Sequence, residues 1–204
     1  MPERDAGNLK LLGGRLCLDF VNTVDWRGTE SPVEFLNCAD DLLRWGVHSG
    51  MIAPAEADDL GRVIENKASV VGRVVARAIR LRETIYRLFA AVAAAAPHDP
   101  KDLAEVNRFL TANLQYLHIA ASDGRFHWRR ATLSTSLDGF LADIVKSTVD
   151  LLVSDDLNRV KMCADPRCAW LFLDVSKNNS RRWCDMKDCG NRAKVSRFYR
   201  KRKS

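Results

Sequence analysis

The stretch CADPRCAWLFLDVSKNNSRRWCDMKDCGNR, residues 163–192, decides how the C-terminal part of this 204-residue chain folds. It holds four of the six cysteines as two pairs, each pair with four residues between its members and fifteen residues between the pairs. Zn²⁺ binds thiolates tetrahedrally, and a short interval lets one turn supply two of them. We therefore expect one structural Zn²⁺ held by Cys163, Cys168, Cys184 and Cys189.

Two other interpretations of these thiols are a reduced, metal-free cluster and a redox dithiol. A redox pair favours a spacing of two residues, which neither pair has. A catalytic zinc would need an open coordination position, whereas four sulfurs and no histidine in residues 159–204 favour a closed site. Cys17 and Cys38 stand apart in apolar surroundings and are expected to be packed thiols.

The fifteen-residue spacer predicts a β-hairpin. AWLFLD and RRW have the composition of strands, and Asn178-Asn179 between them suits a tight turn. The expected order is a first cysteine turn, a hairpin, the second cysteine pair and a helix, as in treble-clef-type zinc modules. About forty residues provide too small a core to fold alone, so the metal should stabilise the module.

Positive charge is concentrated in the C-terminal part of the chain, from Cys163 onward. Residues 163–204 contain 12 Lys/Arg and 4 Asp/Glu, against 20 and 22 in residues 1–162. On a helix from Arg192, an arc of Val195, Phe198 and Tyr199 with Arg202 is expected to pack on the zinc module, leaving cations outward. A solvated face or a complement to the helix dipole would be the simpler interpretation, and acidic lipid is a third.

The charge density favours nucleic acid, whose phosphates Lys and Arg neutralise. The apolar residues are too few for a membrane. The predicted nucleic-acid-binding residues are Arg181, Arg182, Arg192, Lys194, Arg197, Arg200, Lys201 and Lys203.

Residues 1–158 have a mainly helical pattern. Asp58–Ala96 contains no proline and predicts one long helix or two abutting ones, ended by Pro97 and Pro100. Asp123-Gly124, between Ile119 and the run 126–128, predicts a hairpin. The expected fold class is α+β, mainly α: a helical domain of residues 1–158 with a small β element, and a treble-clef-like zinc domain of residues 159–204.

Five polar or aromatic residues lie within nine positions near the N-terminus: Asp19, Asn22, Thr23, Trp26 and Arg27. They could line a small-molecule pocket, which would make this domain a sensor. The alternative is that they satisfy backbone ends and cap a turn inside the fold.

Neither catalysis nor membrane insertion is expected. The four histidines are scattered, and neither a glycine-rich phosphate loop nor a Ser-His-Asp order stands out, so we expect no enzyme. The N-terminus lacks the apolar region of a secretory signal, and the longest apolar run, residues 88–96, is too short for a bilayer. These features predict a cytoplasmic protein, where thiols stay reduced.

Two segments resemble known families. The run RVKMCADPRC to RFYRKRK, residues 159–203, resembles the CGNR zinc finger, named for the tetrapeptide at 189–192, and GRLCLDFVNTVDWRG, residues 14–28, is similar to the ABATE domain. The resemblance implies a bacterial, stress-induced transcription regulator with the four cysteines as zinc ligands. Expected partners are duplex DNA, a second copy paired through the helix around 69–96, and a small-molecule effector. The alternatives are an RNA- or ribosome-associated binding protein, and a small-molecule-binding N-terminal domain whose zinc module serves as a protein-interaction clip.

Overall fold

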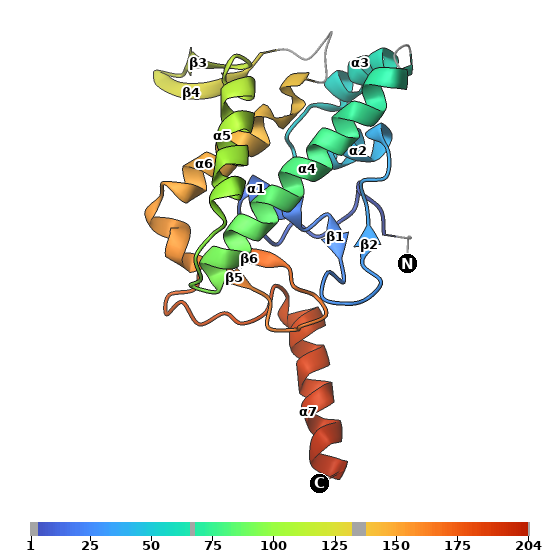
Figure 1. Ribbon diagram of the computed structural model, residues 1–204, viewed down its shortest axis with the longest axis vertical. Coiled ribbons are helices and arrows are strands. Elements are labelled where there is room, and N and C mark those ends of the chain that lie inside the picture. The colour runs from blue at the N-terminus through green and yellow to red at the C-terminus, as the bar shows by residue number, and fades with distance from the viewer. Residues whose placement is uncertain (1–3, 66–67, 132–137, 204) are drawn as a thin grey trace.

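The computed structural model describes residues 4–65, 68–131 and 138–203, drawn in Figure 1. The α-helices are α1 (Leu16–Val21), α2 (Ala39–His48), α3 (Pro54–Glu65), α4 (Ala68–Ala93), α5 (Pro100–Leu114), α6 (Ala142–Leu152) and α7 (Asn191–Lys203). Shorter helical turns are η1 (Asp138–Leu141), η2 (Asp155–Arg159) and η3 (Met186–Gly190). The strands are β1 (Val24–Asp25), β2 (Val33–Glu34), β3 (Leu117–Ser122), β4 (Arg125–Arg130), β5 (Val160–Met162) and β6 (Leu171–Leu173). The expected mainly helical fold with small β elements is confirmed.

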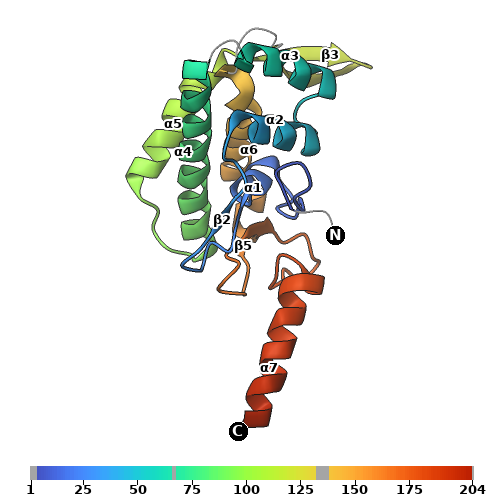
Figure 2. The same ribbon diagram turned by 90° about the vertical axis from the view of Figure 1, so that its right-hand side faces the viewer.

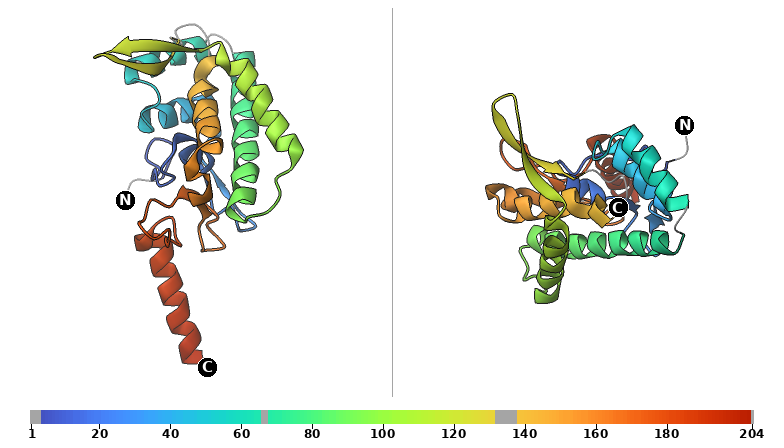
Figure 3. Two further views of the ribbon diagram at one scale, coloured as in Figure 1. Left: turned by 90° about the vertical axis from the view of Figure 1, so that its left-hand side faces the viewer. Right: turned by 90° about the horizontal axis from the view of Figure 1, so that it is seen from above.

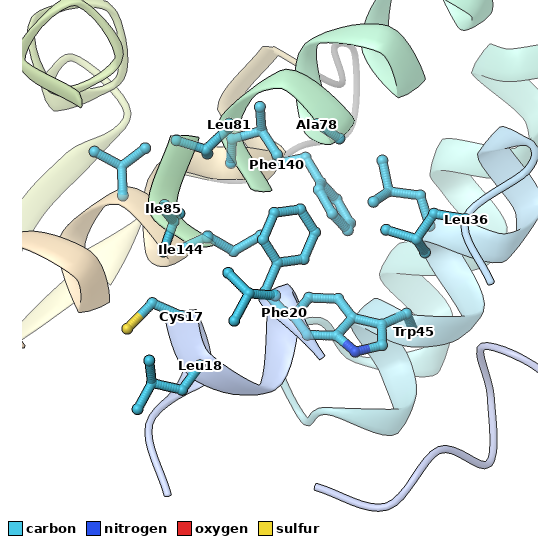
Figure 4. Packing of buried hydrophobic residues seen from close by; sticks show 14 of the residues in the cluster. Cys17, Leu18, Phe20, Leu36, Trp45, Ala78, Leu81, Ile85, Phe140 and Ile144 are labelled. Carbon is cyan, nitrogen blue, oxygen red and sulfur yellow. The ribbon is translucent and has the colours of Figure 1, made fainter. Parts of the chain in front are cut away.

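The short helix α1 lies at the centre of the helical body. Its residues Cys17, Leu18, Phe20 and Val21 are buried, and it contacts α4 and α6. A helix that is apolar on most sides is a core helix. Figure 4 shows Phe20 beside Trp45 of α2, with ring centroids 5.1 Å apart.

The proline-free segment forms two helices, α3 and α4, which is the second of the two arrangements that the sequence predicts. The apolar residues of α4 from Val74 to Phe89 recur every three or four positions and face the core, with Ala78, Leu81 and Ile85 fully buried. Because these side chains are packed inside one chain, they are not free to pair two copies. Pairing of two copies through this helix would have to use its other residues, and it stays a prediction.

The hairpin β3–β4 forms where the sequence predicts it. Ser122 pairs with Arg125, so Asp123 and Gly124 make a two-residue turn, and both have positive φ, at 50° and 71°. Such values are those of a type I′ turn, whose twist matches that of the strands. The hairpin lies at the end of the molecule opposite α7, as the left view of Figure 3 shows.

The hairpin of the zinc module differs from the predicted one. β6 pairs with β5, through Val160↔Leu173 and Met162↔Leu171, and the first cysteine turn forms the loop between these strands. Residues 181–183 form no strand. Arg181 is held by a side chain instead, since the Asp174 carboxylate accepts from the Arg181 N–H at 2.8 Å and from Lys161 Nζ at 2.7 Å, and the Arg182 carbonyl accepts from the Ala164 N–H.

This hairpin belongs to the main core as well as to the zinc module. Val160, Leu171 and Leu173 lie in the same buried cluster as Leu18 and Phe20. The pair of strands contacts α4, and β6 also contacts α1. The first part of the zinc module and the helical body therefore share one hydrophobic core.

Candidate metal centre and nucleic-acid interface

The two cysteine pairs come from two turns that are built differently. Cys163 directly follows β5, and its N–H donates to the Trp170 carbonyl at 2.8 Å, which continues the ladder of the hairpin. The turn then closes when the Cys168 N–H donates to the Asp165 carbonyl at 3.0 Å. Cys184 and Cys189 flank the start of η3, a π-helical turn that leads directly into α7. One pair is thus fixed to a strand pair and the other to a helix.

The four sulfurs meet in a buried cluster. All four Sγ atoms lie within 4.8 Å of one another, and the Cys168–Cys184 and Cys184–Cys189 pairs are each 3.6 Å apart. Each cysteine is at most 4% exposed and none is oxidised to a disulfide. With a Zn–S bond of about 2.3 Å, tetrahedral ligation requires sulfurs about 3.8 Å apart. The donor set and its spacing fit one structural Zn²⁺ with no open position.

Arg192 links this cluster to the rest of the module. Its Nη2 donates to Cys189 Sγ at 2.8 Å and its Nε donates to Asp165 Oδ2 at 2.9 Å. Burial acts to raise the pKa of Asp165, but the hydrogen bonds from Arg192 and from the Arg167 N–H, together with the charges of these two arginines, keep that pKa below its usual value. A cation on a ligand sulfur stabilises the thiolate that zinc needs. Arg192 therefore supports the metal centre from outside the ligand set.

Hydrogen bonding within the cluster favours a thiolate at Cys163, while it raises the pKa of Cys168 and Cys184 and keeps them as thiol donors. The contact with the Cys168 thiol lowers the pKa of Cys163, because a thiolate is the better acceptor. A bound metal would extend the same effect to all four sulfurs.

The zinc module docks on the helical body through hydrogen bonds that each join a side chain of one part to a backbone group of the other. Asn22, which is 2% exposed, bonds both the N–H and the C=O of Leu171. The Trp170 indole N–H donates to the Val24 carbonyl at 2.9 Å, and Tyr86 Oη donates to the Ala169 carbonyl at 3.2 Å. Buried backbone groups need such partners, so these residues fix the position of β6.

The first cysteine turn packs against Gly28 with no space for a side chain. The Gly28 N–H donates to the Arg167 carbonyl at 3.2 Å. A Cβ on Gly28 would lie 1.6 Å from the Pro166 carbonyl oxygen, which is a clash with backbone. Beside it, the Trp26 ring lies under two guanidinium groups, with Arg192 at 4.9 Å and Arg167 at 5.6 Å from its centroid. These contacts are cation–π interactions.

The five residues predicted for a small-molecule pocket therefore have internal partners. Besides the contacts of Asn22 and Trp26, Asp19 accepts from the Gly13 N–H at 2.7 Å. The Thr23 hydroxyl donates to the Phe20 carbonyl, and Arg27 makes a bidentate pair with Glu83 at 2.8 and 2.9 Å. These bonds follow the alternative interpretation, in which the set satisfies groups inside the fold. Ligand binding by these residues stays a prediction.

The predicted nucleic-acid-binding residues divide into two groups. Arg181 faces inward, where its guanidinium stacks over Phe172 at 4.3 Å and donates to the Trp183 and Cys184 carbonyls. Arg192 is engaged as described above. Arg182, Lys194 and Arg197 are exposed. The side chains of Arg200, Lys201 and Lys203 lie outside what the structure describes, although the α7 backbone continues to Lys203.

The expectation that the apolar arc of α7 packs on the zinc module is wrong. Val195, Phe198 and Tyr199 are 54%, 57% and 61% exposed. The physical reason is the direction of the helix: η3 is capped by Asp185, whose carboxylate accepts from the Lys187 N–H, and α7 continues from η3 away from the body, as Figures 1 and 2 show. The N-cap of this continuous helical segment is thus Asp185 at the start of η3, and α7 follows η3 without a break.

None of the helices in the described part of the chain has the length and apolar character that a membrane span needs.

Two family models match the chain. The ABATE model, described as "Putative stress-induced transcription regulator", matches residues 14–155, and the CGNR zinc finger model matches residues 159–202. A comparison with curated proteins finds no match.

Proposed function

The chain belongs to the ABATE family and ends in a CGNR zinc finger, and from this premise we propose that it is a DNA-binding transcription regulator rather than an enzyme. The zinc finger serves as a rigid base, and α7 is the element that contacts the nucleic acid. The helical body supplies sensing or assembly.

One observation carries this proposal: a strongly basic helix stands free of the body. The thirteen residues of α7 include seven Lys/Arg and no Asp/Glu. Its exposed cations Lys194 and Arg197 have no ion-pair partner among the described residues. An α-helix fits the major groove of duplex DNA, and Lys and Arg neutralise its phosphates.

Three contacts hold the base of α7. They suit a helix that must keep one orientation relative to the body. Cys189 ties η3 to the metal cluster, and Arg192 ties the first turn of α7 to Asp165. Lys10 bonds both Asp185 at 2.6 Å and Asp188 at 2.7 Å. Restricting a binding element before it binds lowers the entropy cost of association.

The exposed arc of α7 fits the same role. Phe198 and Tyr199 form an edge-to-face pair with centroids 5.9 Å apart, on a helix with seven Lys/Arg among its thirteen residues. Apolar side chains in a major groove contact thymine methyl groups. Self-association of two α7 helices through this arc alone is disfavoured, because each helix carries seven positive charges that repel those of the other.

For the small-molecule effector, a hollow in the helical body is a better candidate than the N-terminal polar set. It measures about 800 Å³ and lies between α3, β4 and α6, where Trp128, Ser147 and Lys146 line it. Arg130, 8% exposed at its side chain, bridges Glu56 and Asp143 across it. A ligand there would contact groups from three elements at once.

The test is a salt titration of duplex DNA binding by the zinc-loaded full-length protein. We expect Lys194→Glu with Arg197→Glu to weaken binding by at least about tenfold and to reduce the salt dependence, by about 0.9 in slope for each phosphate that is no longer neutralised. The matched control is Arg125→Glu with Arg129→Glu, at the opposite end of the molecule. Equal affinities for both variants would contradict the role of α7. Stronger competition by structured RNA than by duplex DNA would favour the RNA-binding alternative.

A further inference from the structure

A second cationic surface lies at the base of α7. Between the first cysteine turn, the Arg182-Trp183 pair and the first turns of α7 runs a groove of about 1030 Å³. Ala164 and Pro166 form one wall, and Arg197 on α7 lies on the other. The groove therefore joins the two halves of the zinc module to the helix.

The free charge of this groove is positive. Arg167, Arg182, Lys187 and Arg197 line it and are exposed. Its two carboxylates are already paired: Asp165 with Arg192 at 2.9 Å and with Arg167 at 3.5 Å, and Asp188 with Lys10 at 2.7 Å. Among the residues that the structure describes, Arg182, Lys187 and Arg197 therefore carry the unpaired positive charge of the groove.

Two of these cations are held in place by aromatic rings. The Arg182 guanidinium lies 5.3 Å from the centroid of Trp183, and Trp183 packs on the buried cysteine cluster. The Arg182 carbonyl accepts from the Ala164 N–H at 2.8 Å, which fixes its backbone to the first cysteine turn. Arg167 lies over Trp26 at 5.6 Å. A planar guanidinium that is already oriented loses little freedom when it binds a phosphate bidentately.

We propose that this groove holds the sugar-phosphate backbone of the same duplex that α7 enters, with Arg182 and Lys187 as phosphate-contacting residues. The inference rests on the proposed DNA-binding function and adds a second contact to it. Backbone contacts carry no sequence information, but they set the register and orientation of a reading element. The groove continues directly onto α7 at Arg197, so one strand can pass from the groove to the helix.

The experiment measures binding of a random-sequence duplex at several salt concentrations, using zinc-loaded full-length protein. The groove variant is Arg182→Gln with Lys187→Gln. We expect a three- to thirtyfold weaker affinity and a salt slope that is smaller by about 1 to 2, since each phosphate contact contributes about 0.9. The control of equal charge change is Arg125→Gln with Arg129→Gln, which should bind as the unaltered protein does. Unchanged zinc content shows that the module remains folded.

A comparison with Lys194→Gln and Arg197→Gln on α7 separates the two proposals. If the α7 variant loses affinity while the groove variant keeps both affinity and slope, the groove proposal is wrong and the function of α7 stands. If both variants bind as the control does, the proposed DNA-binding function itself fails. A groove variant that binds more weakly at an unchanged salt slope would also overturn the assignment of phosphate contacts to Arg182 and Lys187.

Discussion

Asn22 and Leu171 exchange two hydrogen bonds although 149 residues separate them: Asn22 Nδ2 donates to the Leu171 carbonyl at 2.8 Å, and Asn22 Oδ1 accepts from the Leu171 N–H at 3.0 Å. The side chain thus acts as an additional strand partner for β6. Through this contact, the segment that follows α1 holds the strand on which the first cysteine turn is built.

Replacing Asn22 should therefore destabilise the whole chain. In Asn22→Ala, the buried N–H and C=O of Leu171 lose their partners, and each unsatisfied group costs about 1–3 kcal/mol. We expect the free energy of unfolding in urea to fall by about 2–4 kcal/mol. Asn107→Ala, at an exposed position of α5, is the control and should change it by less than about 0.5 kcal/mol. Equal effects of the two substitutions would contradict the role of Asn22.

Gly28 gives a second test of the same interface. In Gly28→Ala, the new methyl group would clash with the Pro166 carbonyl, so the first cysteine turn must move away from the body. We expect a loss of at least about 2 kcal/mol in stability and faster zinc release to a chelator. Gly61→Ala in α3, where a Cβ meets nothing within 4 Å, should instead stabilise by about 0.5–1 kcal/mol. An unaltered zinc release rate in the Gly28 variant would exclude this coupling.

What could be predicted from sequence followed from local rules. The cysteine spacing identified the four thiols that cluster, Pro97 and Pro100 marked the region where the long helix α4 has ended, and the Asp123-Gly124 pair marked the β3–β4 turn. In each of these cases the cause lies within a few residues, in the fixed φ of proline, in a turn that tolerates positive φ, or in the reach of one metal ion.

The errors arose where the cause is distant in sequence. RRW has strand composition, but β6 pairs with β5 because Val160, Leu171 and Leu173 must join the core beside Leu18. The arc of α7 has the spacing of a packed face, yet the direction in which η3 leaves the cluster carries it into solvent. Likewise, Asn22 and Trp26 are polar or aromatic residues near a turn, and only the folded chain shows that their partners are Leu171 and Arg192.

Zinc removal should unfold more than the C-terminal module. Because β6 belongs to the main core, loss of the metal frees a strand on which α1 and α4 pack. We expect Cys184→Ser to lose its stoichiometric zinc and to lower the midpoint of thermal unfolding, followed by far-UV circular dichroism of the helices, by about 10 °C or more.

The matched control is Cys38→Ser. Cys38 is exposed, so the expectation of a packed thiol holds for Cys17 and is wrong for Cys38, which is not a member of the cluster. This variant should retain zinc and its unfolding midpoint. If the helical signal of the Cys184 variant melted as in the unaltered chain, the module and the body would be independent units.

Asp19 should give the stability a measurable pH dependence. Burial raises its pKa to about 6, against smaller opposing effects of the hydrogen bond from Gly13 and the charge of His48. The folded chain therefore binds the Asp19 proton more tightly than the unfolded chain does. This contribution to stability is complete below about pH 4 and is lost as the pH rises through about 6.

Asp19→Asn keeps an oxygen for the Gly13 N–H and cannot ionise, so it should lack this loss. Urea unfolding at a series of pH values should show the original chain losing up to about 3 kcal/mol relative to the variant between about pH 4 and 7. Parallel curves for the two proteins would mean that Asp19 ionises as freely in the folded chain as in the unfolded one.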